Sequence, residues 1–262
     1  MTVGRSGPRV RYAVDAGTGV ATVTLDRPEK RNALDRALIQ SLVEAFERTR
    51  ADNDARVVLL EAAGRDFCAG ADLAQLESLI DATYEEQLAD ASALGELFVR
   101  MRGIPRPIVA AVHGNALAGG AGLATACDIV LAADDARLGY PEVHLGFVPA
   151  MVMTMLVRNV GEKRAFELVA TGRRIDAEEA LRLGLVNAVY NRHTFADDAR
   201  AFAAELAGRP ASALALIKRL LYELDELSFE KGIARGAEIN AEARMTEECR
   251  AGVRAFLQGK GG

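Results

Sequence analysis

Two short segments rich in small residues carry the chemistry that the sequence suggests. The first runs from Phe67 to Leu73 (FCAGADL), and the second from His113 to Leu123, with glycines at positions 114, 119, 120 and 122. Each follows an apolar run that predicts a buried strand, and each leads into a predicted helix. Small residues let a ligand approach the backbone, and amides at the start of a helix stabilise negative charge. Brought together, the two turns would form an oxyanion hole.

Glycine-rich turns occur in several classes of protein, and the spacing of the glycines separates some of these classes. Either segment alone is equally compatible with glycines that only relieve crowding in a tight turn. The second segment does not fit the G-x-G-x-x-G pattern of a dinucleotide site, and no Gly-Lys-Ser/Thr follows it as in a Walker loop. A serine hydrolase is disfavoured, because the chain has no G-x-S-x-G and neither segment contains a serine.

One carboxylate stands where it could move protons. Glu142 is the only acidic residue between Asp135 and Glu162, and its neighbours are mostly apolar. Apolar surroundings raise the pKa of a carboxyl group, which suits general acid–base catalysis near neutral pH. His144 lies two residues further on and would share the same side of an extended segment, where it either assists Glu142 or is a peripheral histidine.

Composition argues against several other classes of protein. The 262 residues are 50% apolar and 26% charged, with a net charge of −5, so no basic balance suggests a nucleic-acid partner. Three cysteines and three histidines, without metal-site spacing, predict neither a disulfide framework nor a metal site. The sequence shows no signal peptide, and its apolar stretches are interrupted before they reach a membrane-spanning length. We therefore expect a cytoplasmic protein without a membrane partner.

The elements that must position these residues alternate between strands and helices. This order predicts a mostly parallel α/β fold. The chain then turns wholly helical, which predicts a division into an α/β core over 1–195, with the site, and a helical region over 196–262. Strands are expected at 21–25, 57–60, 108–112, 129–132 and 186–189. Helices are expected at 35–52, 85–102, from Asp176 to Gly184, and at 195–207, 211–226 and 229–257.

Four stretches, in order along nearly the whole chain, resemble the crotonase (enoyl-CoA hydratase/isomerase) family. They are LDRPEKRNAL at 25–34, FCAGADL at 67–73, ALAGGAGLATACDI at 116–129 and ARLGYPE at 136–142. The resemblance implies a spiral ββα core and chemistry at C2–C3 of an enoyl-CoA thioester, through an enolate held in an oxyanion hole. It assigns the backbone amides of that hole to Ala71 and Gly119, and the catalytic acid to Glu142.

The resemblance also implies the partners. Coenzyme A is part of the substrate and no further cofactor or metal is expected. The adenine of coenzyme A would lie against Ala69, Gly70 and Ala71, with Lys30 and Arg31 near the phosphates of coenzyme A. Asp72 would either contact coenzyme A or cap the helix that follows it. The apolar faces of the C-terminal helices imply a homotrimer or a dimer of trimers.

The sequence departs from the family at one position that bears on the reaction. Family hydratases typically carry a second glutamate where this chain has Gly122, and no Asp or Glu occurs from Leu97 to Cys127. Hydration by a lyase, one-base isomerisation, and a methylglutaconyl-type hydratase or decarboxylase reaction therefore all stay open. So does a non-catalytic protein that binds coenzyme A or RNA. The glycine also predicts extra space for a branched or polar acyl group.

Two further groups of residues have open interpretations. Cys68 lies inside the first segment and is expected to be a small buried side chain. Several apolar residues either line an acyl pocket or belong to the core: Leu73, Leu76, Leu79, Ile80, Met151, Met153 and Met155.

Overall fold

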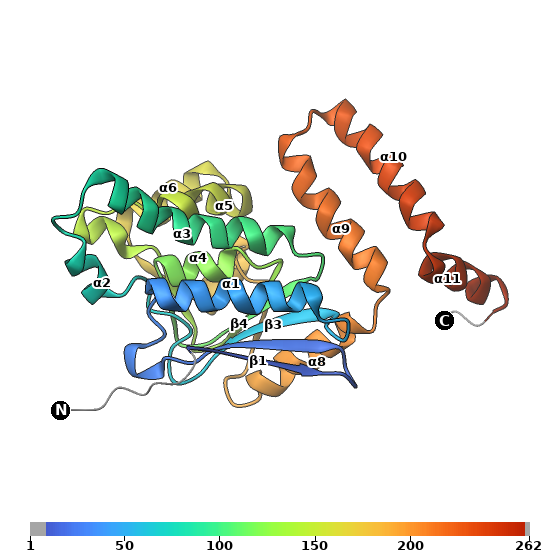
Figure 1. Ribbon diagram of the computed structural model, residues 1–262, viewed down its shortest axis with the longest axis horizontal. Coiled ribbons are helices and arrows are strands. Elements are labelled where there is room, and N and C mark those ends of the chain that lie inside the picture. The colour runs from blue at the N-terminus through green and yellow to red at the C-terminus, as the bar shows by residue number, and fades with distance from the viewer. Residues whose placement is uncertain (1–8, 260–262) are drawn as a thin grey trace.

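A six-stranded sheet forms the centre of the computed structural model, which describes residues 9–259 (Figure 1). Its strand order is β1-β2-β3-β4-β6-β9, and all neighbours are parallel except β1 and β2. The mostly parallel α/β core is therefore confirmed. The strands are β1 (Val10–Asp15), β2 (Val20–Leu25), β3 (Val57–Ala62), β4 (Ile108–Val112), β6 (Ile129–Ala133) and β9 (Ala188–Tyr190).

Both faces of this sheet are covered by helices, which explains the unbroken apolar runs of its central strands. Along β3, Val58 and Leu60 belong to the larger core cluster, whereas Val57 and Leu59 belong to a second cluster on the other face. Helices α1 (Arg36–Ala51) and α3 (Tyr84–Gly103) cover the first face. Helix α8 (Phe195–Ala207) covers the second, to which it turns residues spaced four apart: Phe195, Ala199, Ala203 and Ala207.

A second, three-stranded sheet and several short helices lie beside the central sheet, where the site is built. The strands, in the order β5-β7-β8, are β5 (Asn115–Leu117), β7 (Arg137–Gly139) and β8 (Arg174–Asp176). The helices are α2 (Leu73–Ser78), α4 (Gly119–Thr125), α5 (Ala150–Val160), α6 (Glu162–Thr171) and α7 (Ala177–Leu183), with 3-10 turns η1 (Pro28–Lys30) and η2 (Pro141–Leu145).

The predicted ends of α7 are confirmed by its caps. The Asp176 carboxylate accepts a hydrogen bond from the Glu179 amide at 2.8 Å, and Gly184 ends the helix with φ of 84°. The long helix expected at 229–257 is instead two helices. The side chain of Thr246 accepts from the Cys249 amide and so starts a new helix at that point.

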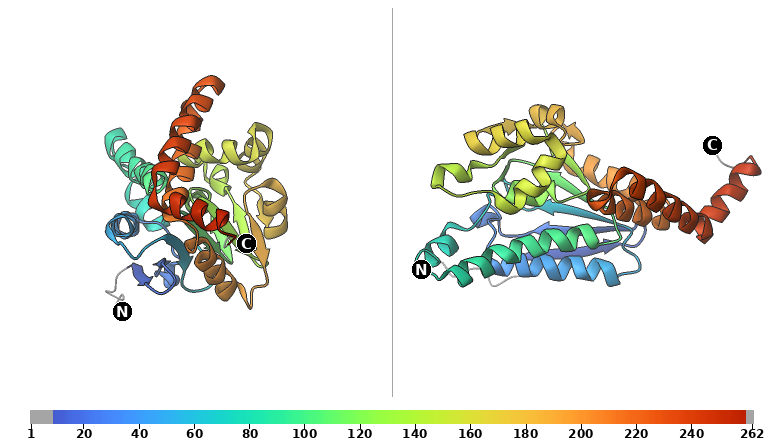
Figure 2. Two further views of the ribbon diagram at one scale, coloured as in Figure 1. Left: turned by 90° about the vertical axis from the view of Figure 1, so that its right-hand side faces the viewer. Right: turned by 90° about the horizontal axis from the view of Figure 1, so that it is seen from above.

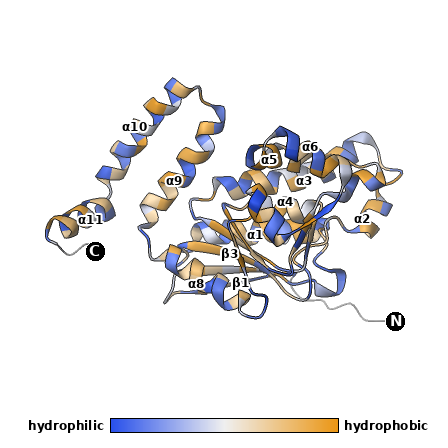
Figure 3. Cartoon of the chain, turned by 180° about the vertical axis from the view of Figure 1, so that it is seen from behind, coloured by the Kyte–Doolittle hydropathy of each residue, from blue (hydrophilic) through white to orange (hydrophobic). Residues whose placement is uncertain are grey.

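Three helices after α8 project from the body of the molecule (Figures 1 and 2). They are α9 (Ala211–Glu223), α10 (Phe229–Met245) and α11 (Glu247–Leu257), with the turn η3 (Leu224–Glu226) after α9. Hydrophobic residues are spread along them (Figure 3), and many are exposed: Ile217, Leu221, Phe229, Ile233, Met245, Val253, Phe256 and Leu257. The division of the chain at residue 195 stays a prediction. Among the described residues, no helix is long and apolar enough to cross a membrane.

A buried ammonium group fastens α9 to the body. The side chain of Lys218 is only 6% exposed, and its Nζ donates to the carbonyls of Met101 (2.9 Å) and Arg106 (3.1 Å) and to Asp128 Oδ2 (2.7 Å). Tyr222, one turn later, donates to Asp128 Oδ1 at 2.6 Å. Each oxygen of the Asp128 carboxylate is thus satisfied from α9, so the attachment relies on both partners remaining charged.

We expect Lys218→Ala to lower the free energy of unfolding by about 3–5 kcal/mol, because it leaves the carboxylate of Asp128 buried without its cation. Chemical denaturation followed by circular dichroism measures the change. The matched control is Lys163→Ala on α6, where the lysine is exposed, and it should change stability by less than about 0.5 kcal/mol. Equal effects of the two substitutions would refute the role of Lys218.

Candidate active site

The two small-residue segments lie side by side and are joined through their backbones. The amide of Cys68 donates to the carbonyl of Asn115 at 3.0 Å, and the amide of Leu117 donates to the carbonyl of Cys68 at 3.0 Å. Residues 68 and 116 form a parallel bridge. The predicted meeting of the two turns is therefore present in the fold.

Glycines at two positions make this contact possible. A Cβ atom at Gly120 would lie 2.3 Å from the carbonyl oxygen of Cys68, and one at Gly70 would lie 2.9 Å from that of Leu117. Gly70 also has φ of 96°, which side chains rarely allow. Glycine is thus required at positions 70 and 120 because any side chain there would collide with the other segment. The two glycines thereby allow the segments to lie in contact.

The amide of Ala71 points away from the strand-like contact beside it. Leu34 forms backbone hydrogen bonds with the residues on either side of Ala71. Its amide donates to the carbonyl of Gly70 at 2.7 Å, and its carbonyl accepts from the amide of Asp72 at 2.9 Å. In a parallel bridge, the N–H of the residue between those neighbours faces the other side. Within residues 9–259, the amide of Ala71 has no backbone acceptor.

Among residues 9–259, the amide of Gly119 also has no backbone acceptor, but for a different reason. Gly119 is the first residue of α4, and the first amides of a helix lack an intrahelical acceptor. The preceding residue, Ala118, has φ of 52° and ψ of −127°, which is strained for a residue with a side chain. The amide of Ala118 donates to the carbonyl of Gly139 at 2.8 Å, which helps to fix this conformation. The entry into α4 is therefore held in a defined orientation.

Ala71, Gly119 and Glu142 all line a single cavity of about 340 Å³. Its walls are formed by the two small-residue segments, by helices α1, α2 and α3, and by the stretch that runs from η2 into α5. The lining residues are Leu34, Ile39, Ala69, Ala71, Asp72, Leu73, Gln75, Leu76, Asp90, Ala91, Leu94, Ala118, Gly119, Pro141, Glu142, Leu145, Phe147, Val148, Pro149, Ala150, Met151 and Val152.

Glu142 stands in η2, a short turn that begins at Pro141 and ends at Gly146 with φ of 75°. Its Oε2 atom is buried and, among the described residues, has no hydrogen-bond partner. Burial raises the pKa of the Glu142 carboxyl group, and no cation in the described part of the chain lowers it again. A desolvated carboxylate with a free oxygen is suited to take up a proton from a ligand in the cavity.

Asp72 has a different environment although it lines the same cavity. Its carboxylate forms an ion pair with Arg27 at 2.6 Å and accepts from the Ala74 amide at 2.9 Å, so it caps α2 as one interpretation of the sequence expected. Burial alone would raise its pKa, but these hydrogen bonds outweigh burial and the pKa of Asp72 is lowered. The negative charge of this carboxylate is balanced by Arg27, and its hydrogen bonds position the turn at Ala71.

The remaining predicted residues divide between the cavity and its surroundings. Ala69 lines the cavity, and its amide donates to the carbonyl of Arg31 at 3.0 Å. The side chains of Lys30 and Arg31 are exposed outside the lining. His144 is not a lining residue, since its ring packs against Gly172, where a Cβ would lie 2.7 Å from Nε2.

The open interpretations of the apolar residues and of Cys68 are also resolved by position. Leu73, Leu76 and Met151 line the cavity. Leu79, Ile80, Met153 and Met155 do not line it, and Met155 belongs to the core. Cys68 is completely buried, and burial raises the pKa of its thiol to about 12, as expected of a structural side chain.

Two polar lining residues were missed from the sequence, Gln75 on α2 and Asp90 on α3. Each stands in a stretch of mixed polar and apolar residues that has no local signature of a site. Within residues 9–259, no group of three or more His, Cys, Asp or Glu side chains could hold a metal ion.

Comparison with known proteins decides the family. A model of the enoyl-CoA hydratase/isomerase family matches residues 15–260. The chain belongs to this family. It is 44% identical over 239 residues (91% of this chain, 94% of the relative) to a Thermus thermophilus protein named as a candidate enoyl-CoA hydratase. It is 34% identical to the 2,3-dehydroadipyl-CoA hydratase of Escherichia coli, covering 91% of this chain and 92% of that one.

The crotonase fold is shown by solved structures. The crystal structure of an enoyl-CoA hydratase from Mycobacterium smegmatis superposes with a TM-score of 0.92 at 33% identity, covering 97% of this chain and 98% of that chain. The expected α/β spiral core with C-terminal helices is therefore confirmed, and the protein is an acyl-CoA-processing enzyme.

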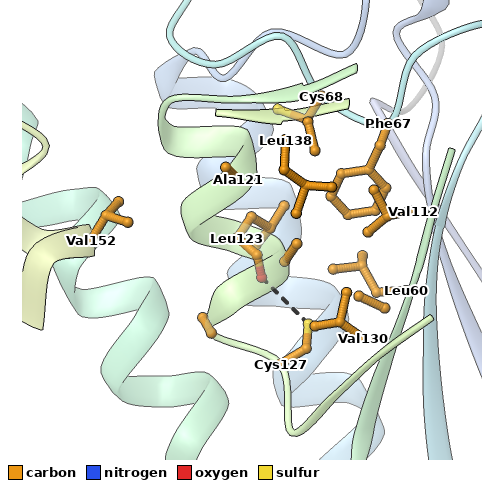
Figure 4. Close-up of a cluster of buried hydrophobic side chains, with 14 of the residues drawn as sticks. Leu60, Phe67, Cys68, Val112, Ala121, Leu123, Cys127, Val130, Leu138 and Val152 are labelled. Carbon is orange, nitrogen blue, oxygen red and sulfur yellow. Dashed lines mark hydrogen bonds between the residues drawn. The ribbon is translucent and has the colours of Figure 1, made fainter. Parts of the chain in front are cut away.

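The space expected at Gly122 is filled by another side chain. A Cβ atom at Gly122 would lie 2.4 Å from Cγ2 of Val152 and 3.3 Å from the ring of Phe98. Val152 is 2% exposed and lines the cavity, whereas Gly122 does not line it (Figure 4 shows Val152 beside α4). In this family member, a valine from α5 thus occupies the position toward which a side chain at 122 would point, and no extra volume is left for substrate.

This contact predicts a coupled pair of substitutions. Gly122→Ala should lower the free energy of unfolding by about 1–3 kcal/mol, because the new methyl group meets Val152. The loss should shrink when Gly122→Ala is made in a Val152→Ala background, which removes that group. Thermal or denaturant unfolding of the four proteins gives the coupling energy.

The matched control is Gly236→Ala on α10, where a Cβ would have no neighbour within 4 Å. That substitution should stabilise the helix by roughly 0.5–1 kcal/mol. If Gly122→Ala behaves like Gly236→Ala, or if its cost is unchanged without Val152, the packing assigned to these two helices is incorrect.

Proposed function

We propose that this enzyme hydrates the C2–C3 double bond of an enoyl-CoA thioester, with Glu142 as its proton-transferring carboxylate. The observation that carries the proposal is that Glu142, with its buried and unpartnered Oε2, lines the same cavity as Ala71 and Gly119. Within the part of the chain that the structure describes, the amides of these two residues have no backbone acceptor. The hydratase names of the Thermus thermophilus and Escherichia coli relatives support hydration.

The two amides form the oxyanion hole of this proposal. When a nucleophile adds at C3, an electron pair moves from the double bond to the thioester carbonyl oxygen, which becomes an enolate oxygen. Two fixed N–H donors stabilise that charge without reorganising, and each is worth about 3 kcal/mol in the transition state. The anchored entry into α4 and the paired Leu34 beside Ala71 keep the donors in place before substrate binds.

Glu142 would supply and remove the proton. Its carboxylate takes a proton from water as the hydroxyl oxygen bonds to C3, and it then returns a proton to C2 as the enolate collapses to the thioester. The net change is the addition of one water molecule. Since Val152 fills the place of a second acid, the same carboxylate serves both steps.

The filled position at Val152 also favours a second candidate, isomerisation by one base. In that reaction Glu142 moves a proton between C4 and C2 through the same enolate and adds no water. The two candidates are separated by the product, a 3-hydroxyacyl thioester for hydration and a shifted double bond for isomerisation.

Recognition of coenzyme A belongs to the residues around the first segment. We assign its adenine to the backbone of Ala69, Gly70 and Ala71 and its phosphates to the exposed side chains of Lys30 and Arg31. The hydrogen bond between the Ala69 amide and the Arg31 carbonyl supports this assignment, because it keeps the basic turn next to the cavity. The absence of a nucleic-acid or membrane partner stays a prediction, and so does a cytoplasmic location.

Glu142→Gln tests the proposed acid directly. The substitution keeps the shape but not the basicity, so kcat for an enoyl-CoA should fall by about a hundredfold or more while the dissociation constant of an acyl-CoA stays within a few-fold. In the unmodified enzyme kcat/KM should fall as pH decreases through the raised pKa of Glu142, since the base becomes protonated.

The control is Glu162→Gln at the start of α6, where the glutamate is exposed, and it should leave kcat unchanged. Turnover of Glu142→Gln close to that of the unmodified enzyme would exclude Glu142 as the acid. That result would not affect the assignment of the oxyanion hole, which does not depend on Glu142.

We further propose that α9, α10 and α11 assemble the protein into a trimer or a dimer of trimers. Their exposed apolar residues support this, because many large apolar side chains gathered on three projecting helices favour a surface that a partner covers. Sedimentation equilibrium at micromolar concentration should give three or six times the 28.0 kDa of one chain. A monomer under these conditions would contradict the proposal.

A further inference from the structure

A polar pair stands in the cavity wall formed by α2 and α3, apart from Glu142. Gln75 Nε2 donates to Asp90 Oδ1 at 2.6 Å, and Gln75 Oε1 accepts from the backbone amide of Arg36 at 2.7 Å. The amide of Gln75 is therefore held at both ends. It fixes one oxygen of Asp90 and leaves the other, Oδ2, without a hydrogen bond among the described residues.

Asp90 is a carboxylate without a counter-ion in the described chain. Asp72, the other aspartate of the lining, is paired with Arg27, but within residues 9–259 no Lys, Arg or His lies within 4.0 Å of the carboxylate of Asp90. None of the described lining residues is cationic. The walls around Asp90 are mostly apolar, including Leu76, Ala91 and Leu94.

The position of Asp90 relative to the reacting group follows from α3. A Cβ at Gly119 would lie 3.4 Å from Cδ2 of Leu94, so Leu94 marks the oxyanion end of this wall. Asp90 comes four residues earlier on the same helix, about 6 Å along its axis. Asp90 therefore lines the same cavity as Gly119, about one helical turn from the residue that packs beside it.

We propose that Asp90 is a specificity-determining residue that accepts a hydrogen bond from a hydroxyl group on the acyl chain and excludes acyl chains that end in a carboxylate. The proposal rests on the function proposed above and names its substrate class. A half-buried carboxylate without a counter-ion, in a cavity wall that is otherwise mostly apolar, attracts a hydrogen-bond donor and repels a second negative charge.

The proposal separates this enzyme from one of its relatives. The Escherichia coli protein at 34% identity is named for 2,3-dehydroadipyl-CoA, whose acyl chain ends in a carboxylate. The cavity described here offers such a group no cation and places Asp90 in its wall. On this proposal, the acyl class named for that relative does not carry over to this enzyme.

The test compares three 2-enoyl-CoA thioesters of equal chain length that end in a methyl, a hydroxyl or a carboxylate group. In the unmodified enzyme, kcat/KM for the hydroxyl-ended substrate should exceed that for the carboxylate-ended one by at least about tenfold. Asp90→Asn removes the charge and can donate a hydrogen bond. It should raise kcat/KM for the carboxylate-ended substrate about tenfold and leave the methyl-ended one within about twofold.

The matched control is Asp81→Asn, an exposed aspartate between α2 and α3 outside the cavity lining, and it should change no ratio. A uniform change for all three substrates in Asp90→Asn would overturn the proposal, because it would place Asp90 against the coenzyme A portion or in folding. Equal use of all three substrates by the unmodified enzyme would overturn it as well.

Binding measurements keep this test independent of the reaction. Dissociation constants of the three thioesters are measured by calorimetry in Glu142→Gln and in Glu142→Gln/Asp90→Asn. The same selectivity, lost with Asp90, supports the assignment even if none of the thioesters is turned over. Failure of turnover with this selectivity intact would contradict the proposed function alone. Absence of the selectivity in Glu142→Gln, or its persistence in Glu142→Gln/Asp90→Asn, would contradict the role of Asp90 alone.

Discussion

The backbone contact between residues 67–73 and 113–123 is the constraint on which the site depends. Two hydrogen bonds through Cys68 join the segments, and Gly70 and Gly120 let them approach to distances that any side chain would prevent. Parallel strands β3 and β4 lead into these segments from adjacent positions in the sheet. The order of the sheet thus determines which two turns meet, and the small residues determine how closely.

Carboxylates in this protein show how one chemical group takes different roles through its surroundings. Asp128 is satisfied by Lys218 and Tyr222 and fastens a helix, and Asp72 is satisfied by Arg27 and fastens a turn. Glu142 has a buried oxygen with no partner in the described chain. Burying an unpaired polar group costs free energy, so the fold retains this cost at the place where a ligand can supply the missing partner.

Much of the fold and part of the site could be predicted from the sequence because their signals are local. The apolar runs of β3, β4 and β6 mark strands buried on both faces, and Asp176 marks a helix start by its own hydrogen bond. Strand β1 was missed, since its alternately exposed residues at the edge of the sheet form no continuous apolar run. The break at Thr246 was missed because apolar spacing continues across it, while the cap acts on the backbone.

The remainder of the site depends on contacts between residues that are distant in the chain. The space at Gly122 is decided by Val152, which belongs to another helix, and glycine in the sequence carries no information about which side chain fills its place. Asp90 resembles an ordinary polar position of α3, and only Gln75 and Arg36, from two other helices, give its carboxylate a fixed orientation. Such positions follow from packing, which local patterns do not record.

One continuous stretch, from Pro141 to Val152, supplies both Glu142 and part of the wall of the same cavity. Glu142 lies in η2, and Val152 lies in the first turn of α5, joined by a link that is largely exposed and apolar at Leu145, Phe147 and Val148. A shift of α5 that made room for a side chain at Gly122 would therefore also move the segment that orients Glu142. The lack of an acid at position 122 and the position of Glu142 are thus coupled through the chain itself. For this reason that lack is a property of the whole η2–α5 stretch, and replacing one glycine would not by itself restore the acid.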